Sequence, residues 1–328
     1  MVHDRLRRRS YAAIDLGTNN CRLLIARPDG DGFRVTDAYS RIVRLGEGVG
    51  ESRRLGEPAM ARTIEALKVC ADKIARHHCW DVRCVATAAC RSADNAGEFI
   101  ERVKRETGLR LEIIDAAEEA ALALAGCKSL LLGQSEPTLV FDIGGGSTEL
   151  ALAEPFGGGE HHLVRYASFP IGVVNFAERF GGVDVDDETY RRMVAASEEA
   201  IMDFQVETRA AMDRPFRLLG TSGTVTTLAG VFLDLVRYDR TAVDGLTMPA
   251  ARMTEISEHL RRLTLKERAA HPCVGSGRAD LVVGGCAILQ AILNLWPVQE
   301  ITVADRGLRE GILLELMTAD APLLAAGD

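Results

Sequence analysis

The sequence predicts an α/β protein made of two similar halves, each with a mixed β-sheet flanked by helices. Two observations lead to this prediction. A hairpin-like segment occurs once in each half, and strand patterns alternate with helix patterns in both halves. The composition agrees, because 328 residues of which 47% are hydrophobic suffice for two domains that each bury a core.

The repeated segment is Ala12–Ala26, AAIDLGTNNCRLLIA, and its second copy is Leu139–Ala153, LVFDIGGGSTELALA. Each copy has an apolar run that contains Asp near its end, then a small or polar turn, then a second apolar run. Asp15 aligns with Asp142, which lies 127 residues further on. Apolar runs on both sides of a glycine-containing turn are typical of β-hairpins. One recurrence at this distance indicates a duplicated domain rather than a solenoid.

The other elements alternate between strand and helix. The predicted strands cover 82–86, 111–114, 216–219 and 301–303, and the predicted helices cover 95–107, 116–127 and about 308–317. Gly108 is expected to end the helix over 95–107, because glycine is favoured just past a helix end.

The domain border is placed near Gly126, within or just after a helix, and no linker rich in Pro or Ser marks it. Domain I is predicted over 11–125 together with a C-terminal helix at about 305–320, and domain II over 126–304. The halves are expected to pack closely around a cleft. Residues 1–10, rich in arginine, are expected to form a disordered basic leader rather than a nucleic-acid arm.

The charge of the chain limits how it can bind a phosphate-rich partner. Lys and Arg number 39 and Asp and Glu number 47, which gives a formal net charge of −8. An acidic protein does not attract polyanions through its overall field. No nucleic-acid partner is therefore expected, and a phosphate chain would have to be held by backbone amides, a few arginines and a metal ion.

The sequence also predicts a cytoplasmic protein with no membrane partner. No apolar run reaches the roughly 18 residues that span a bilayer. The apolar stretch near the N-terminus is interrupted by Asp15 and Arg22, unlike a secretion signal. The eight cysteines form no C-x-x-C pair, and residues 77–79 lack the spacing of a zinc site. Reduced thiols in a reducing compartment are expected.

The segment DIGGGSTE, from Asp142 to Glu149, is the strongest candidate for phosphate binding. Consecutive glycines let backbone N–H groups approach a phosphate with no Cβ in the way. Asp142 and Glu149 bracket the turn with carboxylate oxygens that suit Mg²⁺, or Mn²⁺ in its place. The predicted phosphate contacts are Gly144, Gly145, Gly146, Ser147 and Thr148. The alternative is a glycine hairpin that only turns the chain.

Further candidates for phosphate binding lie in three other parts of the chain. In the first hairpin they are Asp15, Gly17, Thr18, Asn19 and Arg22, and Arg22 has the alternative of an exposed strand residue. Gly220, Thr221, Ser222 and Gly223 follow a predicted strand and open a helix, where free N–H groups and the helix dipole attract anions. Arg91 and Arg278 are candidate clamps, because guanidinium binds phosphate in a bidentate manner. Each could equally form a surface ion pair.

Two adjacent glutamates open the helix predicted to begin at 116. Asp115 suits an N-cap and Glu118, three residues later, suits a capping box, which gives Glu118 a structural role. Glu119 has no such role and lies just after a strand end, where active-site groups of α/β folds gather. Glu119 is therefore the candidate catalytic carboxylate, with solvent exposure as its alternative.

Seven stretches of the chain, in order from Ala12 to Leu316, resemble one family. The stretches are AAIDLGTNNCRLLIA, VATAACRSADNAGEF, EIIDAAEEA, VFDIGGGSTEL, LLGTSGTVTTLAG, GRADLVVGGCAIL and ITVADRGLREGILLEL. The family is the exopolyphosphatase / guanosine pentaphosphate phosphohydrolase (Ppx/GppA phosphatase) family of the actin-like ATPase superfamily. The resemblance covers nearly the whole chain, and DIGGGSTEL and GTSGT are specific together.

The resemblance implies two actin-like, ribonuclease H-like domains with the active site in the cleft between them. It implies Mg²⁺-dependent release of terminal phosphate from inorganic polyphosphate, from pppGpp or from both, with Glu119 activating the attacking water. The family's metal positions fall on Asp142 and Glu149, and its phosphate and substrate positions fall on Asp15, Gly17, Thr18, Gly144, Gly145, Gly146, Ser147, Arg22, Arg91 and Arg278. A homodimer is the default expectation.

The chain departs from the family's usual pattern beside the proposed base. The E-E-A motif is usually preceded by Ser-Gly and followed by Arg, whereas Ala116 and Ala117 precede it here and Ala121 follows it. The first loop has Thr18 and Asn20 where the family commonly has serines. These departures bear on turnover and substrate preference more than on the reaction class. In length the chain resembles the short, two-domain members.

Two other functions stay open. A non-enzymatic alarmone sensor would bind ppGpp or pppGpp tightly without Mg²⁺-dependent phosphate release, and Ala121 is the departure that favours it. An ATP-dependent small-molecule kinase of the same superfamily would need an adenosine pocket and a sugar-binding insertion, of which the sequence shows no sign. Formation of ADP would identify the kinase.

Overall fold

The computed structural model describes residues 9–30, 32–183 and 185–325. These residues form two compact units. Unit 1 extends to Cys127 and resumes at Gly307, and unit 2 is Lys128–Arg306. Most of the predicted leader, residues 1–8, lies outside the described part. Ser10, the last residue of the predicted leader, is buried, and the Ser10 carbonyl accepts a hydrogen bond from the Trp80 N–H. No helix within the described ranges is both long and apolar enough to cross a membrane.

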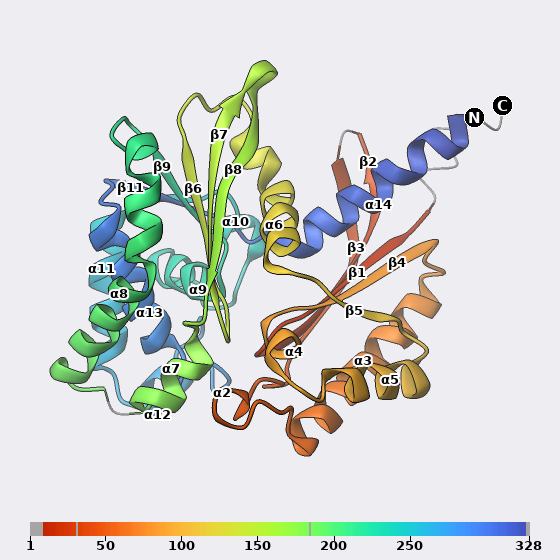
Figure 1. The fold of residues 1–328 in the computed structure, drawn as a ribbon, viewed down its shortest axis with the longest axis horizontal. Coiled ribbons are helices and arrows are strands. Elements are labelled where there is room, and N and C mark those ends of the chain that lie inside the picture. Colours follow the sequence, from red (N-terminus) through yellow and green to blue (C-terminus); the bar gives the residue numbers. More distant parts are fainter. Residues whose placement is uncertain (1–8, 31, 184, 326–328) are drawn as a thin grey trace. The chain divides into compact units, whose positions relative to one another are not determined.

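Unit 1 is a five-stranded mixed sheet with helices on both faces (Figure 1). Its strands are β1 Tyr11–Leu16, β2 Asn20–Asp29, β3 Gly32–Ile42, β4 Asp81–Ala86 and β5 Leu111–Ile113, in the order β3-β2-β1-β4-β5. Its helices are α2 Val49–Ser52, α3 Glu57–Arg76, α4 Ala88–Ser92, α5 Ala96–Thr107, the first part of α6 Ala116–Leu131, and α14 Leu308–Ala325. The strands β4 and β5 are parallel to β1, whereas β2 and β3 form antiparallel hairpins with their neighbours.

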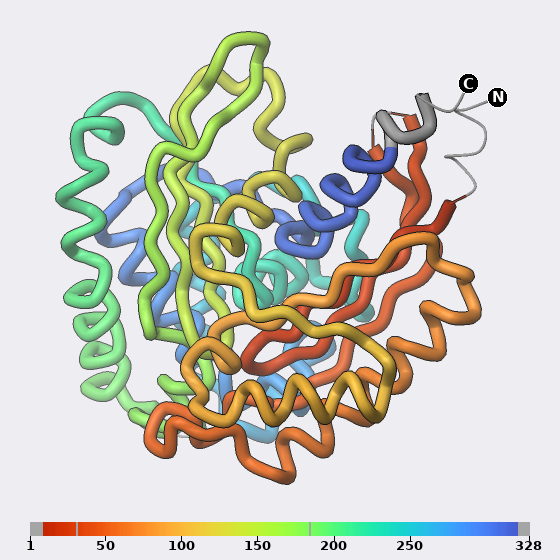
Figure 2. The backbone as a smooth tube through the Cα atoms, turned by 45° about the vertical axis from the view of Figure 1, so that its right-hand side comes forward, coloured from red at the N-terminus to blue at the C-terminus, as the bar shows by residue number. Residues whose placement is uncertain are grey.

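The two faces of the unit 1 sheet pack on different helices. Ile14 and Leu23 on one face meet Leu67 of α3 and Phe99 of α5 in one buried cluster. On the other face, a second cluster joins strand residues to Ile312 of α14 and Leu122 of α6. Figure 2 shows α14, in blue, along the red strands β1 and β2 that it contacts.

Unit 2 repeats this arrangement with one more strand. Its strands are β6 Thr138–Ile143, β7 Thr148–Phe156, β8 Glu160–Phe169, β9 Arg217–Gly220, β10 Thr247–Pro249 and β11 Glu300–Val303. Its helices are α7 Val173–Phe180, α8 Asp187–Met212, α9 Gly223–Phe232, α10 Arg240–Val243, α11 Ala250–Arg262, α12 Leu265–Ala270 and α13 Val282–Leu295. The sheet order is β10-β11-β9-β6-β7-β8, and the core gathers side chains from α8, α9, α11 and α13.

The two sheets have the same topology. Read from the antiparallel edge, β3-β2-β1-β4-β5 corresponds to β8-β7-β6-β9-β11, and β10 is an added antiparallel edge strand. Three neighbouring strands run parallel in each sheet: β1, β4 and β5 in unit 1, and β6, β9 and β11 in unit 2. Their carboxyl ends therefore share one edge of each sheet, where loops that bind ligands are usually found. The predicted architecture, two similar halves that each have a mixed sheet flanked by helices, is confirmed.

Several predicted elements differ in their ends. The helix expected to stop at Cys127 continues to Leu131, because no glycine or proline lies between Cys127 and Gly133, which has a positive φ of 75°. The last helix also runs past 317, to Ala325. The helix over 96–107 ends at Gly108, whose φ is 74°, as the sequence predicted. The strands β3 and β8 and the long helix α8 had no specific prediction.

Candidate functional site

The hairpin β6–β7 of unit 2 carries the glycine turn. Asp142 lies opposite Glu149 in the ladder, and the Gly144 N–H donates to the Ser147 carbonyl at 2.8 Å to close the turn. Gly144 is required here, because a Cβ at this position would lie 2.9 Å from the Ser147 oxygen. The turn thus projects beyond the carboxyl end of β6.

The outward carbonyls of this turn are held by the start of α7. The N–H groups of Val173 and Val174 donate to the Gly144 and Gly145 carbonyls at 3.0 and 2.8 Å. The Asn175 side chain donates to the Gly146 carbonyl at 3.0 Å. With the carbonyls fixed on one side, the amides of the turn lie on the other. No acceptor within the described ranges receives the N–H groups of residues 145–147. Such a row of N–H donors forms an anion-binding concavity.

The hydroxyl groups of this segment have structural partners. Ser147 Oγ donates to Glu149 Oε1 at 2.5 Å, and Ser168 Oγ donates to the same oxygen at 2.8 Å. Thr148 is fully buried and its hydroxyl donates to the Ile171 carbonyl at 2.7 Å. The predicted phosphate contact of Thr148 is therefore wrong for its hydroxyl, because the single O–H is already used inside the protein.

Asp142 and Glu149 fit a site for Mg²⁺. Directly opposite residues of an antiparallel pair point to the same face, so both carboxylates lie on one side of the turn. Among the described residues, no group of three His, Cys, Asp or Glu side chains could hold a metal by itself. Mg²⁺ is commonly bound by one or two carboxylates, with substrate phosphates and water as the other ligands. These two residues match that pattern.

The third predicted loop connects β9 to α9 in unit 2. Gly220 is needed for packing, because a Cβ there would lie 2.6 Å from the Phe141 ring. Ser222 is buried and its side chain caps α9 by accepting from the Val225 N–H at 3.1 Å. A phosphate role for Gly220 and for the Ser222 oxygen is therefore not supported. Thr221 and Gly223 are left at the partly exposed start of the helix.

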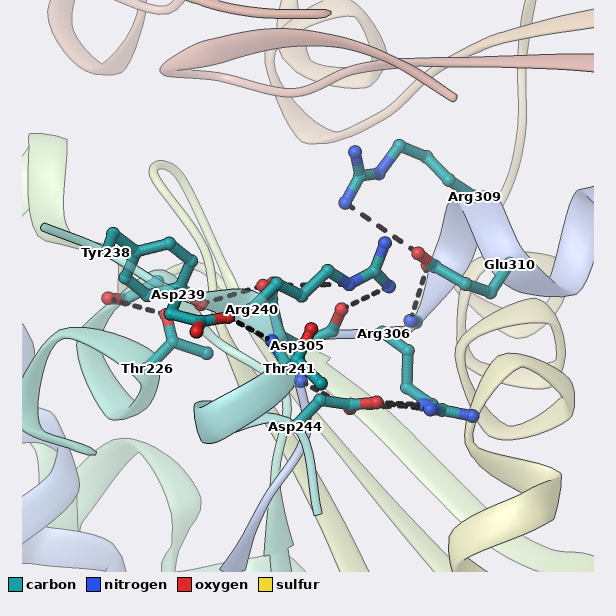
Figure 3. A network of polar contacts seen from close by, with 12 residues as sticks. Thr226, Tyr238, Asp239, Arg240, Thr241, Asp244, Asp305, Arg306, Arg309 and Glu310 are labelled. Atoms are coloured by element: carbon teal, nitrogen blue, oxygen red, sulfur yellow. Dashed lines mark hydrogen bonds and ion pairs between the residues drawn. The ribbon is translucent and has the colours of Figure 1, made fainter. Parts of the chain in front are cut away.

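Arg278 and the segment after β11 lie beside α9. Arg278 Nη1 donates to Thr227 Oγ1 at 3.2 Å. A polar network then fixes the chain after β11 (Figure 3). Within it, Tyr238 Oη donates to Asp305 Oδ2 at 2.7 Å and Arg240 Nη2 donates to the Asp305 carbonyl at 2.5 Å. Asp244 accepts from the Asp305 N–H at 3.0 Å and from the Arg306 guanidinium. This network was not predicted.

The hairpin β1–β2 of unit 1 has the same turn. The Gly17 N–H donates to the Asn20 carbonyl at 2.9 Å, and Asp15 lies opposite Arg22. Thr18 and Asn19 are both 6% exposed, and their carbonyls accept from N–H groups of the segment 43–46. Among described residues, no donor reaches the buried Asn19 Oδ1. An unsatisfied buried amide oxygen is uncommon and often accompanies a functional site.

Asp15 sits in a charged surrounding at the end of β1. Burial raises the pKa of the Asp15 carboxyl; Arg22 and Arg309 oppose that rise, and Glu310 adds to it. Arg309 and Glu310 belong to the first turn of α14. Sequence reasoning missed both, although they lie in the stretch ITVADRGLREGILLEL that resembles the family. The signal was two charged residues beside a glycine at a predicted helix start.

Glu119 is held by an arginine that was predicted to bind substrate. Arg91 Nη1 lies 2.6 Å from Glu119 Oε2 and also donates to the Ile114 carbonyl at 3.1 Å. The two side chains are 21% and 15% exposed, so the alternative of a solvent-exposed Glu119 is wrong. Both contacts use Nη1, and Nε and Nη2 of Arg91 have no acceptor within the described part of the chain, so these donors can serve a ligand.

The neighbouring glutamate has a structural position. Asp115 Oδ1 accepts from the Glu118 N–H at 2.9 Å, which makes Asp115 the predicted N-cap. The second half of the capping box is absent among these residues, because the Glu118 carboxylate pairs with Arg83 instead. Arg83 also binds Glu112 at 2.6 Å and Glu315 at 3.0 Å. Glu118 is thus part of a network that joins β4, β5, α6 and α14.

Comparison with known proteins finds that this chain is similar to members of one family. A model of the Ppx/GppA phosphatase family matches residues 24–320. Exopolyphosphatase 2 of Mycobacterium tuberculosis is 34% identical over 324 residues, which cover 93% of this chain and 98% of that protein. A guanosine-5′-triphosphate,3′-diphosphate pyrophosphatase of Aeromonas hydrophila is 29% identical, over 94% of this chain and 59% of that protein.

Two solved structures extend the comparison. The crystal structure of a Ppx/GppA family member of Aquifex aeolicus superposes with a TM-score of 0.78 and 30% identity, covering 95% of this chain and 98% of the other. An exopolyphosphatase of Cytophaga hutchinsonii superposes with a TM-score of 0.86 and 27% identity, covering 95% and 98%.

Proposed function

Because the chain belongs to the Ppx/GppA phosphatase family, we propose that it releases the terminal phosphate from inorganic polyphosphate, from pppGpp or from both. The family and the enzyme class that the motifs predicted, a hydrolase of phosphoric anhydrides, are confirmed. The observation that carries the substrate proposal is the turn between Asp142 and Glu149, in which the N–H groups of residues 145–147 donate to no acceptor among the described residues.

Phosphate binding is assigned to backbone amides and arginines. The N–H groups of Gly145, Gly146 and Ser147 would hold phosphate oxygens of the substrate, and Arg91 and Arg278 would add charge. Backbone donors suit this task in a chain of net charge −8, because they attract phosphate locally without a basic surface. In the same proposal, Thr18 and Asn19 of the first hairpin also bind phosphate.

A divalent cation, Mg²⁺ or Mn²⁺, is assigned to Asp142 and Glu149. When bound, it would neutralise charge that develops on the phosphate oxygens. The protein's own contribution is orientation of the ligands. Ser147 and Ser168 saturate Glu149 Oε1 at 2.5 and 2.8 Å and thereby direct Oε2 toward the turn. The two serines fix the carboxylate in one rotamer before substrate arrives.

The chemical step is assigned to Glu119. Its carboxylate would accept a proton from water while the water oxygen forms a bond to the terminal phosphorus and the bridging P–O bond breaks. The electron pair of that bond leaves with the shortened chain. Arg91 holds the Glu119 carboxylate in place, since its Nη1 lies 2.6 Å from Oε2.

One assay separates this function from its alternatives. The protein is incubated with Mg²⁺ and polyphosphate, pppGpp or ATP, and phosphate and ADP are quantified. Phosphate released from polyphosphate or pppGpp, abolished by EDTA, supports the proposal. ADP formed only with an added small-molecule acceptor would identify a kinase instead.

The alarmone sensor is the second candidate, and one contact favours it. Arg91 Nη1 lies 2.6 Å from Glu119 Oε2 and so occupies a carboxylate oxygen that would otherwise be open to the attacking water. With Ala121 in place of the family's usual arginine, no other cation follows in the motif to take up Arg91's role. Tight binding of ppGpp with no phosphate release from any of the three compounds would establish the sensor.

A further inference from the structure

Arg309 is a mostly buried cation at the start of α14. Its side chain is 14% exposed, and its nearest carboxylate within the described ranges is Glu310, whose Oε1 lies 4.0 Å from Nη2. That distance is too long for a hydrogen bond. Glu310 itself is fixed, because its Oε2 accepts from the Gly307 N–H at 2.9 Å. Figure 3 shows the Arg309 side chain extending away from α14 beyond Glu310.

Arg22 is a second such cation in the same unit. It lies opposite Asp15 in the β1–β2 ladder, and α14 packs against β1. Within the part of the chain described, the Arg22 guanidinium makes no hydrogen bond or ion pair. The Tyr11 hydroxyl at the start of β1 donates to Asp320, near the far end of α14, and α14 packs along β1. Arg309, at the start of α14, therefore lies toward the Asp15 end of β1. The charges of both arginines oppose the rise in the pKa of the Asp15 carboxyl. Neither donates a hydrogen bond to Asp15.

Two other arginines of this protein, which have structural roles, have several acceptors for their guanidinium groups. Arg268 is 1% exposed, and its guanidinium donates to four carbonyls: those of Leu263, Ala279, Gly182 and Val183. Arg83 pairs with three carboxylates. A guanidinium carries five N–H donors, and donors withdrawn from water without acceptors cost free energy. Arg22 and Arg309 lack the acceptors that Arg268 and Arg83 have.

We infer that Arg22 and Arg309 together bind a phosphate group of the substrate at the edge of the unit 1 sheet, beside Asp15. The ligand class is the phosphate or phosphonate group of a polyanion, because its oxygens match the planar fork of guanidinium. Arg309 is the new member of this site. The inference rests on the proposed function for the identity of the natural ligand, since it adds a subsite to the same phosphate chain.

The test uses a ligand that no hydrolase of anhydrides consumes. Methylenebisphosphonate carries two phosphonate groups joined by carbon, and its binding to the full chain in Mg²⁺ is measured by titration calorimetry. Arg309→Ala should raise the Kd about tenfold or more, the loss of a bidentate charge-assisted contact. Arg105→Ala is the matched control, because it also removes one cation from unit 1. The Arg105 side chain is 68% exposed, and its Nη2 makes one loose ion pair, 3.7 Å from Glu106 Oε1. The Kd of this control should stay within about twofold of wild type.

A second variant separates a binding role from a packing role. Arg309→Lys keeps the charge and most of the side-chain volume but not the fork, so its Kd should rise about threefold or more at an unchanged melting temperature. This variant decides the matter where Arg309→Ala does not fold. Wild-type affinity in either folded variant overturns the inference, as does a wild-type protein that does not bind the bisphosphonate.

The outcome for the proposed function is read separately. With polyphosphate as substrate, Arg309→Ala should raise KM and change kcat little, the pattern of lost uniform binding. A wild-type protein that binds methylenebisphosphonate through Arg309 but releases no phosphate refutes the hydrolase and leaves the subsite standing. A hydrolase whose KM does not respond to Arg309 refutes the subsite alone.

Discussion

The two hairpins of this protein have one backbone and two chemistries. In unit 1 the turn is closed by the Gly17 N–H and the Asn20 carbonyl at 2.9 Å, and in unit 2 by Gly144 and Ser147 at 2.8 Å. Each of these residues lies 127 positions from its counterpart, as do the cross-strand partners. Asp15 is opposite Arg22, but Asp142 is opposite Glu149. Duplication kept the turn and reversed the charge of one flank.

This difference assigns different tasks to the two hairpins. An Asp beside an Arg carries little net charge and can meet a phosphate directly, whereas two carboxylates attract a divalent cation. The residue after the first glycine of the turn also differs. The methyl group of Thr18 packs against Gly46, so closely that a Cβ on Gly46 would lie 2.2 Å from it. The counterpart of Thr18 in unit 2 is Gly145, which has no side chain. Unit 2 therefore presents the barer backbone.

The helices that follow the last parallel strand of each sheet differ in the same way. Glu118 and Glu119 are the third and fourth residues of α6, and Glu310 and Gly311 hold those positions in α14. Gly311 is required by packing, because a Cβ there would lie 2.0 Å from the Leu122 carbonyl. Only one of the two helices can therefore place a carboxylate at its fourth position.

The largest expected effect is that of removing the metal. EDTA should abolish phosphate release, and Mg²⁺ or Mn²⁺ should restore it, because amides alone cannot neutralise a phosphate chain. Asp142→Asn should need about tenfold or more Mg²⁺ for half-maximal rate. Asp15→Asn, the same change in unit 1, should lower the rate without moving the Mg²⁺ requirement. A Mg²⁺ titration that shifts for Asp15→Asn and not for Asp142→Asn reverses the assignment of the two hairpins.

The next effect concerns the two adjacent glutamates of α6. Glu119→Gln keeps the shape but removes the base, so kcat should fall by about 10²–10⁴ with little change in substrate affinity. Glu118→Gln loses only a partly exposed ion pair to Arg83 and should stay within about threefold of wild-type kcat. Steady-state kinetics of the two variants tests these roles. An inactive Glu118→Gln variant beside an active Glu119→Gln variant would contradict the assignment of catalysis to Glu119 and of a structural role to Glu118.

A reciprocal exchange tests the two turns. Gly145→Thr puts the unit 1 residue into unit 2, where its side chain should block the approach of phosphate and weaken binding by about tenfold or more. Thr18→Gly makes the opposite exchange and should weaken binding less, since the unit 1 turn is expected to hold phosphate less closely. Binding of methylenebisphosphonate to folded variants is the measurement. Equal losses would show that the turns share the task.

The sequence predicted the duplication because the 127-residue spacing of Asp15 and Asp142 reflects backbone hydrogen bonds that both turns keep. It also predicted the fold class and the N-cap Asp115. It did not predict the partners of side chains. Thr148 was assigned to phosphate, but its hydroxyl is used by the Ile171 carbonyl, a residue 23 positions away. Such contacts depend on how strands and helices pack and leave no local pattern.

The same reason explains what was missed at the arginines. Arg91 and Glu119 were singled out separately, yet their ion pair joins α4 to α6 across 28 positions. No role was predicted for Arg309, because an arginine in the first turn of a helix is usually solvent-exposed. Its burial follows from the close packing of α14 on β1 and α6. Residue types could be read from the chain, whereas their burial required the fold.

The smallest expected effect is on stability and depends on pH. Burial raises the pKa of Asp15, so the folded protein holds that proton more tightly than the unfolded chain does. The stability that this proton contributes is present below the ordinary Asp pKa of about 3.9 and is lost as pH rises through the raised value. At pH 7 the Asp15 carboxyl therefore opposes folding. Asp15→Asn should melt higher than wild type at pH 7, and the difference should disappear on acidification to about pH 4.

Asp37 supplies a control of the opposite sign. The Lys73 ammonium, at 2.7 Å, lowers the pKa of the Asp37 carboxyl, which contributes stability above its ordinary pKa and loses it as pH falls through the lowered value. Asp37→Asn should therefore melt lower than wild type at pH 7 and approach it in acid. Melting curves of the three proteins between pH 4 and 8 test the pair. If Asp15→Asn instead melts lower at pH 7, Arg22 and Arg309 outweigh burial at Asp15, and the unit 1 hairpin already carries a satisfied ion pair in place of a site that awaits an anion.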